Sequence, residues 1–182
     1  MSPLRTILIL AAAFLAVFWQ SAFHGLRQIL GAQIDLLPGL MVYAGLFTGL
    51  GTVSALSILG GLWSDALSAN PLGISILPLF LVGFVLFLCN EVVLKHSTFA
   101  QVLLGAGAGS LVPLLTLLFL LTLGHAPLVG WITLWQLVIM AAGGAVATPV
   151  IFAIFSWLEG NLLHTHPPES SFRADREIRR GR

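Results

Sequence analysis

The feature that most constrains the fold is a series of long apolar runs, several of them close to about 20 residues long. An α-helix rises about 1.5 Å per residue, so about 20 apolar residues are needed to cross about 30 Å of hydrocarbon. Only 8% of the 182 residues are charged, whereas soluble proteins carry about 25%. The sequence therefore predicts an all-α polytopic membrane protein, with room for five or six spans and no soluble domain.

Six membrane-spanning helices are expected within a single transmembrane domain, 1–160. They are predicted at about 4–23, 36–48, 52–68, 71–94, 99–123 and 131–158. Glu159 is taken as the start of a polar stretch, and residues 161–182 as a flexible, basic cytoplasmic tail. A cleaved signal peptide at the start is disfavoured, because Trp19, Gln20 and Phe23 occupy the place of a small-residue cleavage site.

The second and third of these helices come from one run, 36–64, which holds 29 residues without a charge. That length is long for one span and short for two. Two glycines close together, Gly49 and Gly51, favour a break because glycine weakens a helix. We therefore divide the run there, and one long tilted helix is the alternative.

The orientation follows from the positive charges, since Lys and Arg concentrate on the cytoplasmic side of a membrane. A six-helix layout puts Arg5, Lys95 and the tail inside and Arg27 outside, whereas five helices leave Arg5 alone outside. The rule barely separates these layouts; the glycine break favours six helices, with both termini cytoplasmic. Five of the eight basic residues lie in the tail, at Arg173, Arg176, Arg179, Arg180 and Arg182.

Asp65 is the only acidic residue between Asp35 and Glu91, in otherwise uncharged sequence. A carboxylate near the centre of a bilayer costs about 2.5–3.5 kcal/mol on insertion scales, so its presence needs a reason. Two residues after it are typical of a helix start, Asn70 as N-cap and Pro71 at the first helical position. One helix is therefore expected to end just after Asp65 and the next to begin at Pro71.

This arrangement offers the carboxylate a local role. The free N–H groups at the start of the next helix, near Leu72 and Gly73, attract anions. We favour the interpretation that Asp65 accepts hydrogen bonds from them. Proton or cation coupling is less favoured, because no helix centre supplies a second ionisable group, and contact with a partner protein is the remaining alternative.

Pairs of small residues recur at a spacing of four, which allows helices to approach closely in lipid. Packing within the chain is the favoured interpretation. The alternative is that lipid-facing small residues dock another membrane protein, with Ala12, Ala16, Gly45 and Gly49 as candidates. The pairs are Ala12 with Ala16, Gly45 with Gly49, Gly60 with Ser64, Gly105 with Gly109, and Gly143 with Ala147.

No sequence motif for catalysis, nucleotide binding or metal binding is present. The sole cysteine, Cys89, excludes an intramolecular disulfide. His164 and His166 supply two potential ligands, which do not make a closed metal site. We therefore expect no enzymatic activity, no cofactor, no metal and no nucleic-acid partner.

The pattern Gly-Leu-x-x-Asp followed by Pro-Leu-Gly, together with Asp35-Leu36-Leu37-Pro38 and Val42-Tyr43, resembles the MreD family. These are bacterial rod shape-determining membrane proteins, and the gross layout is similar over about residues 4–160. The residues that carry the strongest part of the resemblance are Gly61, Leu62, Asp65, Pro71, Leu72 and Gly73.

The resemblance implies a bacterial inner-membrane protein of about six helices, similar in fold to substrate-binding subunits of energy-coupling-factor transporters. It implies no enzymatic activity. It implies association with an MreC-like bitopic protein and, through it, with a SEDS glycan polymerase, a penicillin-binding transpeptidase and MreB, in support of lateral peptidoglycan synthesis and cell shape. The alternative function is a vitamin-binding subunit of such a transporter. This alternative is less favoured, because the short loops carry few polar or aromatic groups that could bind a water-soluble vitamin.

Overall fold

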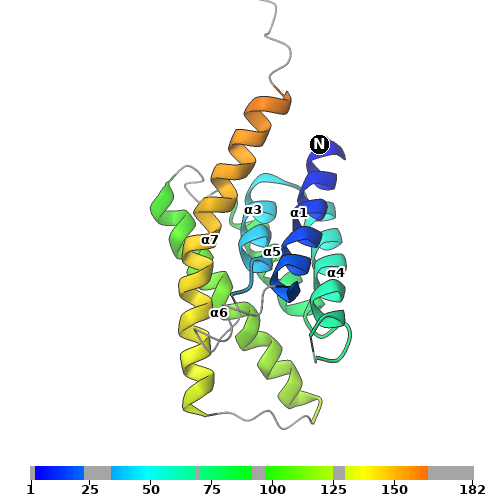
Figure 1. Cartoon of the computed structure of the whole chain (residues 1–182), viewed down its shortest axis with the longest axis vertical. Coiled ribbons are helices and arrows are strands. Elements are labelled where there is room, and N and C mark those ends of the chain that lie inside the picture. The colour runs from blue at the N-terminus through cyan, green and yellow to red at the C-terminus, as the bar shows by residue number, and fades with distance from the viewer. Residues whose placement is uncertain (1–2, 23–33, 69, 92–96, 125–129, 164–182) are drawn as a thin grey trace, which may run out of the picture.

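The computed structural model describes residues 3–22, 34–68, 70–91, 97–124 and 130–163. This part of the chain is all-helical, as predicted, and contains no strand (Figure 1). Its six helices are α1 (Pro3–Ala22), α3 (Leu37–Phe47), α4 (Leu50–Ala66), α5 (Ile76–Leu88), α6 (Thr98–Thr122) and α7 (Trp131–Leu163).

Four of the helices, α1, α3, α4 and α6, lie within two residues of their predicted bounds. The chain leaves the helical conformation at Thr48 and Gly49, so the predicted break is confirmed and the single long helix is excluded. The predicted start of the fourth helix at Pro71 is wrong, because α5 begins at Ile76. Its predicted end at about 94 is also too late: α5 ends at Leu88, and residues 92–96 lie outside the described part.

The helix α3 is the centre of the bundle and contacts the five other described helices. Every residue from Leu37 to Leu46 is buried. Glycines allow its neighbours to approach closely: a Cβ atom at Gly45 would lie 2.9 Å from Cβ of Leu86, and one at Gly83 would meet Met41. The 11 residues of α3 extend about 16 Å, so this helix alone is too short to cross a bilayer.

Contacts between residues fix the relative directions of the helices. Along α3, successive contacts meet increasing residue numbers of α5 (Met41 with Gly83, Gly45 with Leu86) and of α7 (Gly39 with Thr148, Tyr43 with Phe155), so these three helices run the same way. The contacts of α4 with α5 and of α6 with α7 run in opposite order, and α1 is parallel to α4, so α1, α4 and α6 run in the opposite direction. The beginning of α1 and the end of α7 consequently lie at the same end of the bundle (Figure 1).

The packing of α6 against α7 is the most extensive helix contact, and it depends on glycine. A Cβ atom at Gly105 would collide with the carbonyl oxygen of Gly144 and with Thr148. One at Gly109 would lie 2.6 Å from the carbonyl oxygen of Met140. The predicted role of Gly105 and Gly109 in packing within the chain is confirmed.

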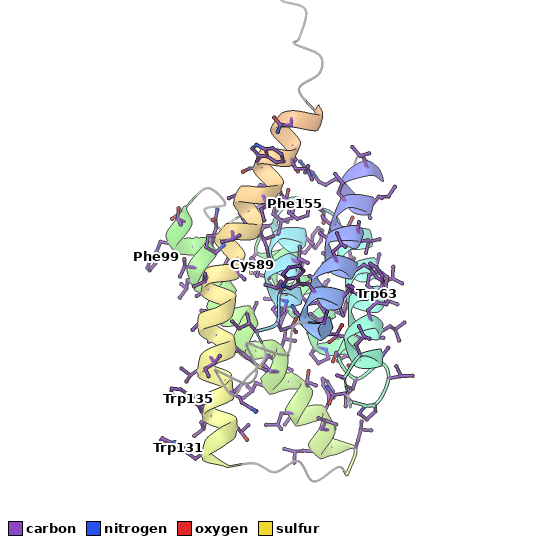
Figure 2. All side chains as sticks on the ribbon, in the orientation of Figure 1. Trp63, Cys89, Phe99, Trp131, Trp135 and Phe155 are labelled. Atoms are coloured by element: carbon purple, nitrogen blue, oxygen red, sulfur yellow. The ribbon has the colours of Figure 1, made fainter. Side chains whose placement is uncertain are left out.

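The outer surface of the bundle is apolar. Trp131 and Trp135 of α7 point away from the other helices (Figure 2) and are 82% and 57% exposed. Three described stretches, Leu4–Ala22, Thr98–Thr122 and Thr133–Asn161, are long and apolar enough to span a membrane. The structure thus fits a membrane protein with three helices of spanning length, and six spans stay a prediction.

Candidate functional sites

Asp65, near the end of α4, holds this helix to the beginning of α5. Its Oδ2 atom accepts the backbone N–H groups of Gly73 at 2.8 Å and of Ser75 at 3.1 Å, and its Oδ1 accepts the hydroxyl of Ser75 at 2.5 Å. The side chain is 1% exposed. The predicted contact with the N–H of Gly73 is confirmed, whereas the part played by Ser75 was missed.

Two glycines of the same motif make this junction sterically possible. Gly61 lies one helical turn before Asp65, and a Cβ atom there would lie 2.9 Å from both Cα and N of Ile76. Gly73 has a φ of +91°, a conformation that side chains other than glycine rarely adopt. The structure therefore brings together Gly61, Asp65 and Gly73, three of the six residues that carry the resemblance.

The other three motif residues, Leu62, Pro71 and Leu72, are exposed, with 73% exposure for Leu72. The predicted N-cap role of Asn70 is wrong: its N–H donates to the hydroxyl of Ser68, and a turn follows it. The physical reason is that Asp65 captures the N–H groups of residues 73 and 75, which bends the chain into this turn before α5 starts.

A second polar cluster, which sequence reasoning missed, ties α1, α3 and α7 together. Glu159 Oε1 lies 2.7 Å from Nε of Arg5 and accepts the hydroxyl of Tyr43 at 2.8 Å. Arg5 also donates from Nη1 to the carbonyl oxygen of Phe47 at 3.2 Å. The side chains of Arg5 and Glu159 are 30% and 25% exposed, so the pair is partly desolvated.

The prediction that Glu159 begins the polar stretch after the last helix is wrong, because α7 continues to Leu163. Three of the residues assigned to the tail are consequently helical, and residues 164–182 lie outside the described part. A helical signal was available: Phe152, Phe155 and Glu159 share one face of α7, and both phenylalanines are buried against Tyr43.

A cavity of about 450 Å³ lies beside this cluster, between α3, α6 and α7. Tyr43, Phe47 and Phe152 form an aromatic side of it, with ring centroids 5.1–5.5 Å apart. The polar side and the remaining lining are formed by Thr98, Gln101, Pro149, Ala153, Ser156 and Glu159. Its volume falls within the range of about 300–1,000 Å³ that is typical of ligand pockets.

Asp35 begins the central helix, since its Oδ1 accepts the N–H of Leu37 at 2.9 Å. Burial raises the pKa of this carboxyl, and the hydrogen bond from Leu37 opposes that rise.

The four small residues considered as a docking surface do not form one surface in the structure. Gly45 is buried against α5, so its expected lipid-facing position is wrong. The reason is that α3 is the central helix and has no lipid-facing side. Gly49 lies at the break before α4, whereas Ala12 and Ala16 of α1 are half-buried and pack against the core.

Within the described residues, no group of three or more His, Cys, Asp and Glu side chains could hold a metal ion. Cys89 is a free, exposed thiol. All the histidines (His24, His96, His125, His164 and His166), the cations Arg27 and Lys95, and the tail arginines lie outside the described part. Comparison of the chain with protein-family models, curated proteins and solved structures finds no match.

Proposed function

We propose that this protein is a membrane scaffold of the bacterial cell-elongation complex, with the function of MreD. The observation that carries the proposal is the structure of the motif Gly61, Asp65 and Gly73. These residues form one junction between α4 and α5, in which the buried carboxylate binds backbone N–H groups. A motif that builds a rigid junction suits a protein that presents fixed helix surfaces to others.

The partner surface that we propose is the outer face of α1. This helix is the least buried of the three helices of spanning length. Ile7, Leu15 and Phe18 are 60–63% exposed and lie on neighbouring parts of its surface. Such a face suits contact with the single membrane helix of an MreC-like bitopic protein, which would link the scaffold to a SEDS polymerase, a transpeptidase and MreB.

Co-purification from native membranes tests this partner. Wild-type protein carrying an affinity tag should recover an MreC-like protein, and the double variant Leu15→Ala/Phe18→Ala should recover at least about tenfold less, equivalent to about 1.4 kcal/mol of contact energy. The matched control is Leu114→Ala/Leu118→Ala, which truncates exposed residues of α6. Equal recovery by all three proteins would contradict the proposed surface.

The cellular role has its own test. Depletion of the protein from growing cells, followed by imaging of cell outline and of new wall insertion, should show cells that lose their rod shape as lateral synthesis stops. Cells that keep their shape and lateral insertion after depletion would exclude the elongation complex.

We also propose a six-pass arrangement in the inner membrane, with both termini in the cytoplasm. It is supported by the common end of the bundle at which α1 begins and α7 ends, and by the arginines after α7. Fluorescent-protein and alkaline-phosphatase fusions at both ends measure the orientation. Fluorescence from both ends and phosphatase activity from neither are expected. Phosphatase activity at one end would show an odd number of spans.

One observation favours the second candidate function, a vitamin-binding subunit of an energy-coupling-factor transporter. The cavity between α3, α6 and α7 supplies the aromatic and polar groups that the sequence of the loops does not. A screen of water-soluble vitamins by thermal shift separates this candidate from the scaffold, because a reproducible shift with one vitamin favours the transporter subunit.

A further inference from the structure

The cavity between α3, α6 and α7 opens to the outside of the bundle. Thr98 of α6 and Ala153 and Ser156 of α7 line it and are also exposed. It lies at the end of the bundle where Arg5 and Glu159 meet, and charged side chains at the end of a membrane helix lie at headgroup depth. A ligand can therefore enter sideways, from the surrounding lipid.

The opening is flanked by apolar side chains that face outward. Phe99 and Val102 of α6 are 77% and 37% exposed, and Val150 and Ile154 of α7 are 52% and 54% exposed. A molecule bound in the cavity would have its apolar part against these residues. Apolar surface beside a partly polar cavity is the arrangement that an amphiphile requires.

A carboxylate in the lining of the cavity offers an acceptor to an ammonium group. Glu159 is the acidic side chain among the lining residues, and both Arg5 and Tyr43 contact its Oε1 atom. Within the described part of the chain both contacts fall on Oε1, so the Oε2 atom can accept a donor from a ligand. The rings of Tyr43, Phe47 and Phe152 form the neighbouring wall, and aromatic faces attract cations.

The same cavity also suits a phosphate next to that ammonium. Thr98 supplies a hydroxyl that can donate to a phosphate oxygen, and Gln101, one turn further along α6, adds a polar side chain to the same side of the cavity. Arg5 balances the charge of Glu159, so a ligand with no net charge is favoured over a free cation. The geometry points to a zwitterionic headgroup: we propose that the cavity binds an aminophospholipid, with its primary ammonium on Glu159 and its phosphate towards Thr98 and Gln101. This proposal does not depend on the proposed scaffold function.

Thermal unfolding of delipidated protein in detergent tests the ligand. Phosphatidylethanolamine is expected to raise the melting temperature, with at least tenfold higher affinity than phosphatidylcholine, whose methylated ammonium cannot donate a hydrogen bond. Phosphatidylglycerol, which has no ammonium, is expected to bind at least tenfold more weakly as well. Equal affinities for the three lipids would overturn the proposal. So would equally tight binding of soluble glycerophosphoethanolamine, or a water-soluble vitamin that competes with the lipid.

Two substitutions at neighbouring positions of α7 test whether the lipid binds in this cavity. Ala153→Phe places a ring at the rim of the cavity and leaves Arg5, Tyr43 and Glu159 unsubstituted, and it should lower the affinity for phosphatidylethanolamine at least tenfold. Ile154→Phe is the matched control, since this exposed residue does not line the cavity, and it should bind as the wild type does. Equal binding by the two variants would overturn the site. Glu159→Gln keeps an oxygen acceptor but loses the charge, and should reduce the preference for phosphatidylethanolamine over phosphatidylcholine.

Discussion

Asp65→Ala is expected to lower the free energy of unfolding by about 3–5 kcal/mol. The substitution removes the acceptor of two backbone N–H groups and one hydroxyl, and the site is buried. Each buried donor left without a partner costs about 1–3 kcal/mol. Unfolding in detergent, followed by circular dichroism at increasing denaturant, measures the loss.

Asp65→Asn separates the loss of the hydrogen-bond acceptor from the loss of the negative charge. Its amide oxygen can take the place of Oδ2 and accept the N–H groups of Gly73 and Ser75, while its NH₂ group donates to the hydroxyl oxygen of Ser75. We expect a loss of about 1 kcal/mol, because a neutral acceptor makes weaker hydrogen bonds than a charged one. If both variants fold as stably as the wild type but fail to support cell shape, Asp65 acts directly in function and the junction interpretation is wrong.

Gly105→Ala and Gly144→Ala are expected to disrupt the packing of α6 on α7, each with a loss of about 3 kcal/mol. The added methyl groups meet backbone atoms, which cannot rotate away: Gly105 faces the carbonyl of Gly144, and Gly144 faces the carbonyl of Gly105 and, at 3.2 Å, Cα of Gly109. Overpacking of this kind costs about 1–3 kcal/mol or more. The same denaturation measurement applies, with resistance to a protease as an independent readout of helix separation.

The matched control lies on the same helix. Gly107→Ala adds a methyl group where nothing lies within 4 Å, so the fold should be unaffected or slightly more stable. Equal stability of Gly105→Ala and Gly107→Ala would show that α6 and α7 are not in close contact at Gly105.

Helix positions were largely predictable because apolar length, glycine breaks and helix ends are local signals. The break before Leu50 and the ends of α1, α3 and α6 follow from them. The start of α5 was not predictable by the same reasoning. Asn70 and Pro71 carry a strong local start signal, yet the carboxylate of Asp65 binds the N–H groups of residues 73 and 75 and imposes a turn.

Of the candidate sites, one was predictable from local sequence and the other was not. The Asp65 contact spans 8–10 residues, within reach of reasoning about a helix end and the next helix start. The contact of Tyr43 with Glu159 spans 116 residues and depends on how α3 and α7 pack, which no local pattern specifies. The lipid-facing position expected for Gly45 was wrong for a related reason. Its small size indicated close helix packing, but only the central position of α3 shows that this packing is inside the bundle.

The unequal helix lengths have a consequence for the lipid around the protein. On one side α4 and α5, with 17 and 13 residues, present apolar heights of about 26 and 20 Å, whereas α6 and α7, with 25 and 33 residues, extend about 38 and 50 Å. In the proposed six-pass arrangement, a bilayer with about 30 Å of hydrocarbon has to thin beside the short pair, at a fraction of a kcal/mol per Å of mismatch. When a second membrane protein with short helices packs against the α4–α5 side, the thinned lipid between the two proteins is removed and its deformation energy is released. The bilayer itself would therefore favour such a neighbour on this side.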